Sequence, residues 1–377
     1  MNILMYIPQP GPTRAPEITA NLAKLGNNIV AISPPDRQML ELGVDIKPIR
    51  FTTIPFIGPL FLIGGGLISA MAEIIRSKPD AIYTLGGSMG TGILLARVFR
   101  CPLITELNGW GRAELKLSSR RGFSKLVSTV SRWMDEREMK CSDYLVVVST
   151  SIKNILQKSL NVDSNKIAVI PNGANIHFFQ PISDARKSLD LNQDFHYIGF
   201  AGGFNPWHSL EGLIKSAPLI LERIPNARFL LVGEGPTRSR ISKMVQELHL
   251  AEQFIFVGAV PYAEVPKYVN AMDVCVILKR TDIPGSPLKL YEYMACRKPV
   301  VVTDDSDFDI VREVNAGVLV DPENPVEIAN AIIGLLQDSE LRQQMGNNGI
   351  KYVVEHRSWE MVATEVEEVI SDISSKS

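Results

Sequence analysis

The sequence predicts an α/β protein built from two doubly wound domains, each with a parallel sheet covered by helices on both faces. Two observations predict this class. Short runs rich in β-branched residues alternate with amphipathic segments along the chain, and this alternation restarts after Pro181. In addition, the chain has 377 residues, more than the roughly 250–300 residues at which a single hydrophobic core stops growing.

The first series of expected elements forms an N-terminal domain of residues 1–175. Residues 16–25 have the periodicity of an amphipathic helix. The expected strands are the apolar runs 2–7, 28–33, 81–85, 102–107 and 144–149. The opening run lacks the basic start and the long apolar stretch of a secretory signal, so we expect a buried first strand and a cytoplasmic protein.

The second series forms a C-terminal domain of residues 176–357, after the turn-forming residues Pro171, Asn172 and Gly173. Helices are expected at 210–222 and 238–248. The expected strands are 197–202, 228–233, 254–258, 274–278 and 299–303. Residues 358–377 are expected to form a last helix that returns to the N-terminal domain.

Composition excludes several classes of protein. The formal net charge of −2 disfavours nucleic-acid binding, because a surface that follows phosphates usually carries a large positive excess. None of the four cysteines has C-x-x-C spacing, which disfavours a zinc site or a disulfide framework. Residues 1–176 carry 20 Lys and Arg against 13 Asp and Glu, whereas the remainder is acidic. The positive part could face phosphates or lipid head groups.

Residues 54–72 contain no charge, which meets the bare length requirement of a membrane span. Pro55, Pro59 and three consecutive glycines at 64–66 favour a loop and a core helix instead, since such residues would break a helix in lipid. Contact with the bilayer surface is the alternative. Residues 112–140 support it with eight basic residues against four acidic ones.

Glycines follow the first two strands of the C-terminal domain. Ligands of doubly wound sheets bind beyond the carboxyl ends of the strands, where Gly202, Gly203 and Gly233 would let the backbone approach a ligand closely. The alternative interpretation is that these glycines only permit tight turns between strand and helix.

The segment GSPLKLYEYMA, residues 285–295, is the most informative in the chain. Ser286 and Pro287 are expected to open a helix whose first amides attract phosphate. Lys289 would add a positive charge there. Glu292 follows three residues later on nearly the same face and could accept hydrogen bonds from sugar hydroxyls. An exposed Lys–Glu pair without a ligand is the alternative.

Three other features suggest different chemistry. Residues 86–90 fit the G-x-S-x-G pattern of an esterase, with Ser88 as nucleophile, although every histidine lies beyond residue 176. The aspartates of residues 304–309 could bind a metal, but their place between a strand and a helix favours capping. His208 could donate a hydrogen bond to an anion or be merely structural.

At these residues the sequence resembles the GT-B-fold retaining glycosyltransferases of family 4. The resemblance covers nearly the whole chain and implies two Rossmann-like domains that face each other across a cleft. The similar segments are IPNGANIHFFQP, IGFAGGFNPWHSLEGLIKSA, LVGEGP, GSPLKLYEYMACRKPVVVTD and EHRSWEMVA.

The resemblance also implies site residues. Those expected to bind the donor are Gly11, Arg14, Gly202, Gly203, Gly233, Ser286, Pro287, Leu288, Lys289 and Glu292. Those expected to act in catalysis are Glu106, Asn108, His208 and Lys289. The chain departs from the family at four of its usual positions. Gly203 and His208 replace a basic pair, Pro284 replaces a glutamate and Asn108 replaces a histidine. Lys289, together with Lys279 or Arg280, must then supply most of the positive charge.

The function implied is transfer of a hexose from a UDP- or GDP-sugar to a glycan or lipid-linked acceptor. Retention of configuration is expected without a metal or other cofactor, with the departing phosphate helping to deprotonate the acceptor. Glu106 acting as a general base would give inversion instead. The alternative functions are a non-catalytic partner that binds nucleotide-sugars and, less favoured, the esterase. A peripheral position on the cytoplasmic face of a membrane is the accompanying hypothesis.

Overall fold

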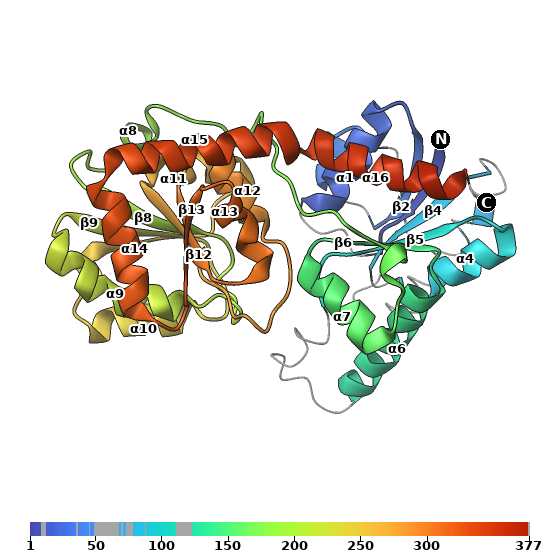
Figure 1. Ribbon diagram of the computed structural model, residues 1–377, viewed down its shortest axis with the longest axis horizontal. Coiled ribbons are helices and arrows are strands. Elements are labelled where there is room, and N and C mark those ends of the chain that lie inside the picture. Colours follow the sequence, from blue (N-terminus) through green and yellow to red (C-terminus); the bar gives the residue numbers. More distant parts are fainter. Residues whose placement is uncertain are drawn as a thin grey trace. The chain divides into compact units, whose positions relative to one another are not determined.

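The computed structural model confirms the predicted class, with two parallel sheets and helices packed against them (Figure 1). It describes residues 1–8, 13–34, 37–44, 46–48, 68, 71–72, 78–86, 88–110 and 123–375. The chain divides into two compact units. One comprises residues 1–172, 284–286 and 359–377, and the other comprises residues 173–283 and 287–358.

The first unit contains a seven-stranded sheet in the order β3-β2-β1-β4-β5-β6-β7, and all of its strand pairs are parallel. Its strands are β1 (Asn2–Tyr6), β2 (Asn28–Ser33), β3 (Ile46–Pro48), β4 (Ala81–Leu85), β5 (Leu103–Leu107), β6 (Tyr144–Val147) and β7 (Ile167–Val169). Its helices are α1 (Arg14–Lys24), α2 (Arg37–Glu41), α4 (Thr91–Phe99), α6 (Phe123–Cys141), α7 (Thr150–Leu160) and α16 (Trp359–Ser374).

The second unit contains a six-stranded parallel sheet in the order β10-β9-β8-β11-β12-β13. Its strands are β8 (His196–Ala201), β9 (Ala227–Val232), β10 (Phe254–Gly258), β11 (Val274–Ile277), β12 (Val300–Thr303) and β13 (Gly317–Val320). Its helices are α8 (Ala185–Ser188), α9 (Leu210–Arg223), α10 (Arg238–Glu247), α11 (Val265–Ala271), α12 (Leu288–Ala295), α13 (Asp309–Glu313), α14 (Pro325–Gln337) and α15 (Ser339–His356).

Strand order indicates where a ligand can bind in the second unit. In the second sheet β8 is followed along the chain by its neighbour β9, and β11 pairs with the other edge of β8. The order therefore reverses at β8, and such a switch point opens a crevice beyond the carboxyl ends of the strands. Residues that follow β8, β9, β10 and β11 meet there.

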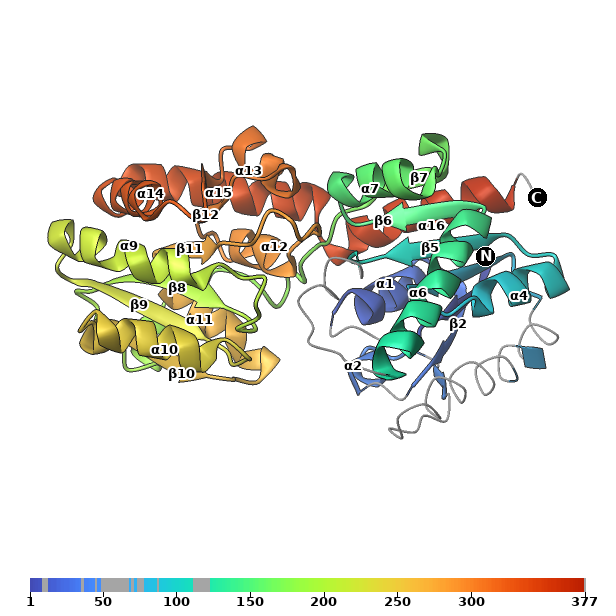
Figure 2. The ribbon, with the colours of Figure 1, turned by 90° about the horizontal axis from the view of Figure 1, so that it is seen from below.

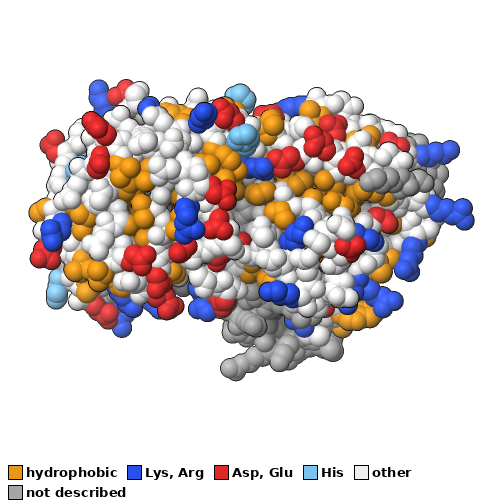
Figure 3. All heavy atoms as spheres, viewed as in Figure 1, with side chains coloured by type: hydrophobic (Ala, Val, Ile, Leu, Met, Phe, Trp, Pro, Cys, Tyr) orange, Lys and Arg blue, Asp and Glu red, His pale blue; other side chains and the backbone are white. Residues whose placement is uncertain are grey.

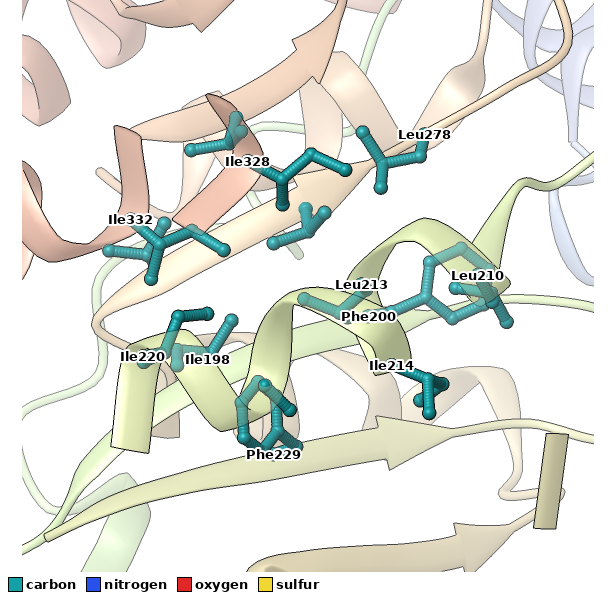
Figure 4. Close-up of a cluster of buried hydrophobic side chains, with 14 of the residues drawn as sticks. Ile198, Phe200, Leu210, Leu213, Ile214, Ile220, Phe229, Leu278, Ile328 and Ile332 are labelled. Atoms are coloured by element: carbon teal, nitrogen blue, oxygen red, sulfur yellow. The ribbon is translucent and has the colours of Figure 1, made fainter. Parts of the chain in front are cut away.

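Apolar side chains hold that edge of the second sheet in place. Phe200 and Ile198 of β8 pack against Leu213 of α9, Phe229 of β9 and Ile332 of α14 in one buried cluster (Figure 4). A second cluster covers the other face, where Tyr293 of α12 is buried. Its hydroxyl donates to the Ala201 carbonyl at 3.0 Å and accepts from the Ala201 amide at 2.7 Å. The carboxyl end of β8 is thus tied to α12.

The C-terminal helix α16 packs on α1 of the first unit. Its first residue, Trp359, is fully buried, and Glu367 accepts a hydrogen bond from the Asn27 side chain. Just before α16 the chain still belongs to the second unit, where the Ala174 amide donates to the Arg357 carbonyl at 2.9 Å. The predicted last helix therefore exists and lies in the first unit.

The two segments predicted to contact a membrane, residues 54–72 and 112–140, are only partly described by the structure. Most of residues 54–72 and residues 111–122 lie outside the described part of the chain. Among the described helices, none combines the length and the apolar character that crossing a bilayer would require. Acidic and basic side chains are interspersed on the face drawn in Figure 3, so the opposite charges of the two halves do not form single-sign surfaces there.

Candidate functional site

The backbone segments that contain Gly202 and Gly233 approach each other closely at the switch point of the second sheet. A Cβ at Gly233, whose φ is +123°, would lie 2.0 Å from the carbonyl oxygen of Gly202. The Gly202 amide donates a hydrogen bond to the Val232 carbonyl at 2.9 Å, and the Gly233 amide donates one to the Gly258 carbonyl at 2.7 Å. Only glycine fits at Gly233, because a side chain would separate the two backbone segments. Gly233 is therefore required by the close approach of two backbone segments, and its contact with a ligand stays a prediction.

Gly202 also makes room for a charged group. A Cβ at this position would lie 2.6 Å from the Nζ atom of Lys289. Lys289 therefore fills the space beside the β8 carboxyl end that a side chain would otherwise occupy. The neighbouring Gly203 is exposed, which leaves its backbone accessible at the same edge.

Lys289 lies in the first turn of α12 among largely apolar neighbours. Its Nζ atom lies 4.2 Å from the centre of the Phe200 ring and 3.1 Å from the Nε2 atom of His208. Burial lowers the pKa of Lys289 to about 7, and the nearby negative charge of Glu292 only partly opposes this effect. The amine can therefore gain or lose a proton near neutral pH.

His208 does not supply a second positive charge, as the expected basic pair would require. Burial, followed by the charge of Lys289, lowers the pKa of His208 to about 2. The imidazole is neutral in any ordinary buffer, and its Nε2 atom is placed to accept a hydrogen bond from Lys289. Its direct partner is thus the lysine.

Glu292 follows Lys289 by three residues and is buried. Its Oε1 atom accepts a hydrogen bond from the Tyr262 hydroxyl at 2.7 Å. Burial raises the pKa of Glu292 to about 6, although the bond from Tyr262 and the charge of Lys289 act in the opposite direction. The Tyr262 ring stacks on Phe178 with 5.5 Å between ring centres. The sequence analysis missed Tyr262, whose only signal was its place after β10.

The start of α12 differs from the prediction in detail. Pro287 is the N-cap with an extended ψ of 118°, and Leu288 is the first helical residue. Ser286 lies in the first unit, where its hydroxyl accepts a hydrogen bond from the Asn172 amide at 3.2 Å. The Asn172 side chain donates to the Ser286 carbonyl. The serine hydroxyl expected to contact the donor thus has a backbone partner.

Lys279 and Arg280 each pair with aspartates of the protein. The Lys279 ammonium is 5% exposed and donates to Asp305 at 3.2 Å, to Asp307 at 3.0 Å and to the Ile283 carbonyl at 2.8 Å. Arg280 pairs with Asp282, and both side chains are exposed. The charge of Lys279 is therefore neutralised within the protein, whereas assistance by Arg280 stays a prediction.

The aspartates of residues 304–309 form ion pairs with basic side chains of the protein. Besides holding Lys279, this run pairs Asp304 and Asp309 with Arg312. Asp305 also accepts from the Asp307 amide as a cap. Within the described ranges, no group of three or more His, Cys, Asp or Glu side chains could hold a metal ion.

Arg14 and Glu106 form a buried ion pair in the first unit. Glu106 is 0% exposed. It accepts hydrogen bonds from Arg14 Nε at 3.0 Å, from Arg14 Nη2 at 3.2 Å and from the Tyr83 hydroxyl at 2.5 Å. Arg14 Nη1 donates to the Pro171 carbonyl at 3.1 Å and to the Asn172 side chain at 3.0 Å. Arg14 thus anchors the segment that leaves the first sheet, and both oxygens of Glu106 have partners.

Three further residues singled out in the N-terminal domain are Asn108, Gly11 and Ser88. Asn108 is exposed just after β5. Gly11 lies outside the described residues. Ser88 is 2% exposed and donates to the buried carboxylate of Glu138. The first unit contains no histidine, so Ser88 lacks the base that an esterase would need.

Comparisons with known proteins agree with the predicted family and fold. Residues 13–178 match the family described as "Glycosyltransferase Family 4", and residues 181–352 match "Glycosyl transferases group 1". The chain is 24% identical over 364 residues to a D-inositol 3-phosphate glycosyltransferase of Corynebacterium glutamicum, covering 91% of this chain and 85% of the relative.

Two further proteins are similar. A UDP-Gal:alpha-D-GlcNAc-diphosphoundecaprenol alpha-1,3-galactosyltransferase of Escherichia coli is 25% identical over 285 residues, covering 73% of this chain and 71% of the relative. The Anabaena HepE structure in complex with UDP-glucose has a TM-score of 0.78 at 18% identity, covering 99% of this chain and 100% of that one. At this identity the likeness shows the fold alone.

The Arg14–Glu106 pair gives a prediction about stability. We expect Arg14→Met to lower the free energy of unfolding by about 3–5 kcal/mol, because it leaves a buried carboxylate without its counter-charge. Adding Glu106→Gln should restore much of the loss, since Gln can still accept from Tyr83. Arg132→Met is the control, because Arg132 forms a partly exposed pair with Glu136 at 3.9 Å and should cost less than about 1 kcal/mol.

Urea unfolding followed by circular dichroism measures all four proteins. Equal losses for Arg14→Met and for the double variant would contradict the account of a buried pair.

Proposed function

Because this chain belongs to the GT-B-fold glycosyltransferases of family 4, we propose that it transfers a hexose from a UDP- or GDP-sugar to a glycan or lipid-linked acceptor. The observation that carries the proposal is the placement of Lys289 and Glu292 on one face of α12, at the switch point of the second sheet. A cation suits a diphosphate, and a carboxylate on the same face suits the hydroxyl groups of the adjoining ribose.

The donor would lie against the glycine crossing. The Gly203 backbone and the Lys289 amine face the diphosphate, while Glu292 exchanges its bond with Tyr262 for bonds to ribose hydroxyls. Because Gly233 has no side chain, the nucleotide can approach the backbone at the end of β9. UDP is the favoured nucleotide, since the printed donor of the similar E. coli enzyme is UDP-galactose.

Retention of configuration is part of the proposal. In a front-face displacement the departing diphosphate takes the proton of the acceptor hydroxyl, so the protein needs no covalent nucleophile. Its task is to stabilise the negative charge that grows on the diphosphate, which Lys289 would do. Both oxygens of Glu106 already accept hydrogen bonds, which disfavours a general base there and hence inversion. The exposed Asn108 is the group proposed to orient the acceptor. No metal is required by this mechanism.

Nucleotide binding tests the donor site. At saturating UDP or GDP we expect one nucleotide to raise the unfolding temperature of the wild type, because a ligand of the folded state stabilises it. Lys289→Ala and Glu292→Ala should each lose most of that rise. Lys267→Ala is the control, because Lys267 is exposed and pairs with Glu264. No shift with either nucleotide, or equal shifts in all variants, would refute the proposed site.

A peripheral position on a membrane is proposed for the first unit. On α6 the exposed Val130 and Trp133 share a face with Arg137, whose guanidinium lies 5.6 Å from the Trp133 ring. Helix α4 packs beside α6 (Figure 2) and exposes Leu94 and Val98. Apolar and aromatic side chains flanked by arginine suit the interface of an anionic bilayer. The E. coli relative, whose printed acceptor is lipid-linked, supports this position.

Vesicle sedimentation tests this part of the proposal. We expect the protein to pellet with phosphatidylserine vesicles at low salt, and Trp133→Ser to weaken the partitioning about tenfold through lost apolar contact. Leu219→Ser is the control, because Leu219 is an exposed apolar residue on α9 of the other unit. A wild type that stays in the supernatant would exclude the membrane position.

A further inference from the structure

The Lys289 side chain is only partly buried, yet among the described residues no carboxylate lies within ion-pair distance of its Nζ atom. The group that faces it from its own helix is Glu292, one turn away and bonded to Tyr262. From β8 and the following loop it is faced by the Phe200 ring and by His208.

This arrangement contrasts with that of Lys279 on the same sheet. Lys279 is more buried yet has two carboxylates and a carbonyl within 3.2 Å. Charge on Lys279 is therefore satisfied by the protein itself. Charge on Lys289 is not, and an anion brought by a ligand would be its first close counter-charge.

We infer that the site takes up one proton from solvent at Lys289 Nζ when a diphosphate binds, and that neutral His208 accepts one N–H of the resulting ammonium so that the others point at the diphosphate. The inference rests on the proposed donor site and concerns its charge state. Lys289 is the group that touches the ligand, and His208 is a positioning residue that acts through it.

Burial sets the pH range of this coupling. With the pKa of Lys289 near 7 in the free protein, the amine is mostly uncharged at pH 8, and a bound diphosphate raises that pKa. The contribution of Lys289 to affinity is then largest below pH 7 and falls as pH rises above 7, by up to about tenfold per unit. At pH 8 neither His208 nor Glu292 titrates, because their pKa values lie near 2 and 6.

Isothermal titration calorimetry with UDP at pH 8 tests the coupling, since buffers of different ionisation enthalpy report protons taken up per nucleotide. GDP replaces UDP if UDP does not bind. We expect about 0.9 proton for the wild type, as follows from a free pKa near 7, and about zero for Lys289→Arg, whose guanidinium stays charged. Lys267→Arg, an exposed control, should match the wild type.

His208 is tested at pH 6, where Lys289 is already charged. His208→Phe keeps an apolar ring without the acceptor, and we expect about tenfold weaker UDP binding, the size of a hydrogen bond to a charged group. His208→Gln keeps an acceptor and should bind within about twofold of the wild type. Unfolding temperatures of both variants separate this effect from misfolding.

The results of these experiments distinguish failure of the inference from failure of the proposed function. Nucleotide binding without proton uptake, or uptake that persists in Lys289→Arg, overturns the inference and leaves the proposed function standing. Equal affinity of His208→Phe and the wild type overturns the role of His208. Absence of binding by either nucleotide removes the donor site and the inference with it.

Discussion

The close crossing of Gly202 and Gly233 is the constraint on which the donor-side geometry depends. A side chain at Gly233 would meet the Gly202 carbonyl at 2.0 Å, and one at Gly202 would meet the Lys289 amine at 2.6 Å. The three residues come from the ends of β8 and β9 and from α12, and Tyr293 ties α12 to β8. A ligand at this edge therefore meets backbone, an amine and a carboxylate at once.

Unequal neutralisation of charge distinguishes Lys289 from Lys279 and Arg14. Lys279 and Arg14 are buried cations whose carboxylates come from the protein, and both hold loops or linkers in place. Lys289 has an aromatic ring and a neutral histidine instead. The cost of leaving a buried cation unpaired makes such a residue a candidate for binding an anion.

Local patterns were sufficient for much of the fold and for the centre of the site. Alternating apolar runs predicted ten strands of the two sheets, whereas β3, β7 and β13 were missed. Strands β3 and β7 have three residues each, too few to show a period. The spacing of Lys289 and Glu292 predicted their shared face. The sequence could not reveal Tyr262 as the partner of Glu292, since it lies 30 residues away in the chain.

The protonation state of His208 and the pairing of Glu106 could not be predicted from the sequence either. The low pKa of His208 arises from burial and from Lys289, 81 residues later. Glu106 was expected to act in catalysis, but its pairing with Arg14 joins residues 92 apart in sequence. Contacts of this kind depend on the sheet order, which one chain read locally does not give.

A crystal structure of the protein with UDP tests the central claim most directly. The account predicts Lys289 Nζ within hydrogen-bond distance of a diphosphate oxygen, about 2.7–3.2 Å, and the Glu292 carboxylate on the ribose hydroxyls in place of Tyr262. A nucleotide bound at another edge of the sheet, with Lys289 still in contact only with His208 and Phe200, would contradict it.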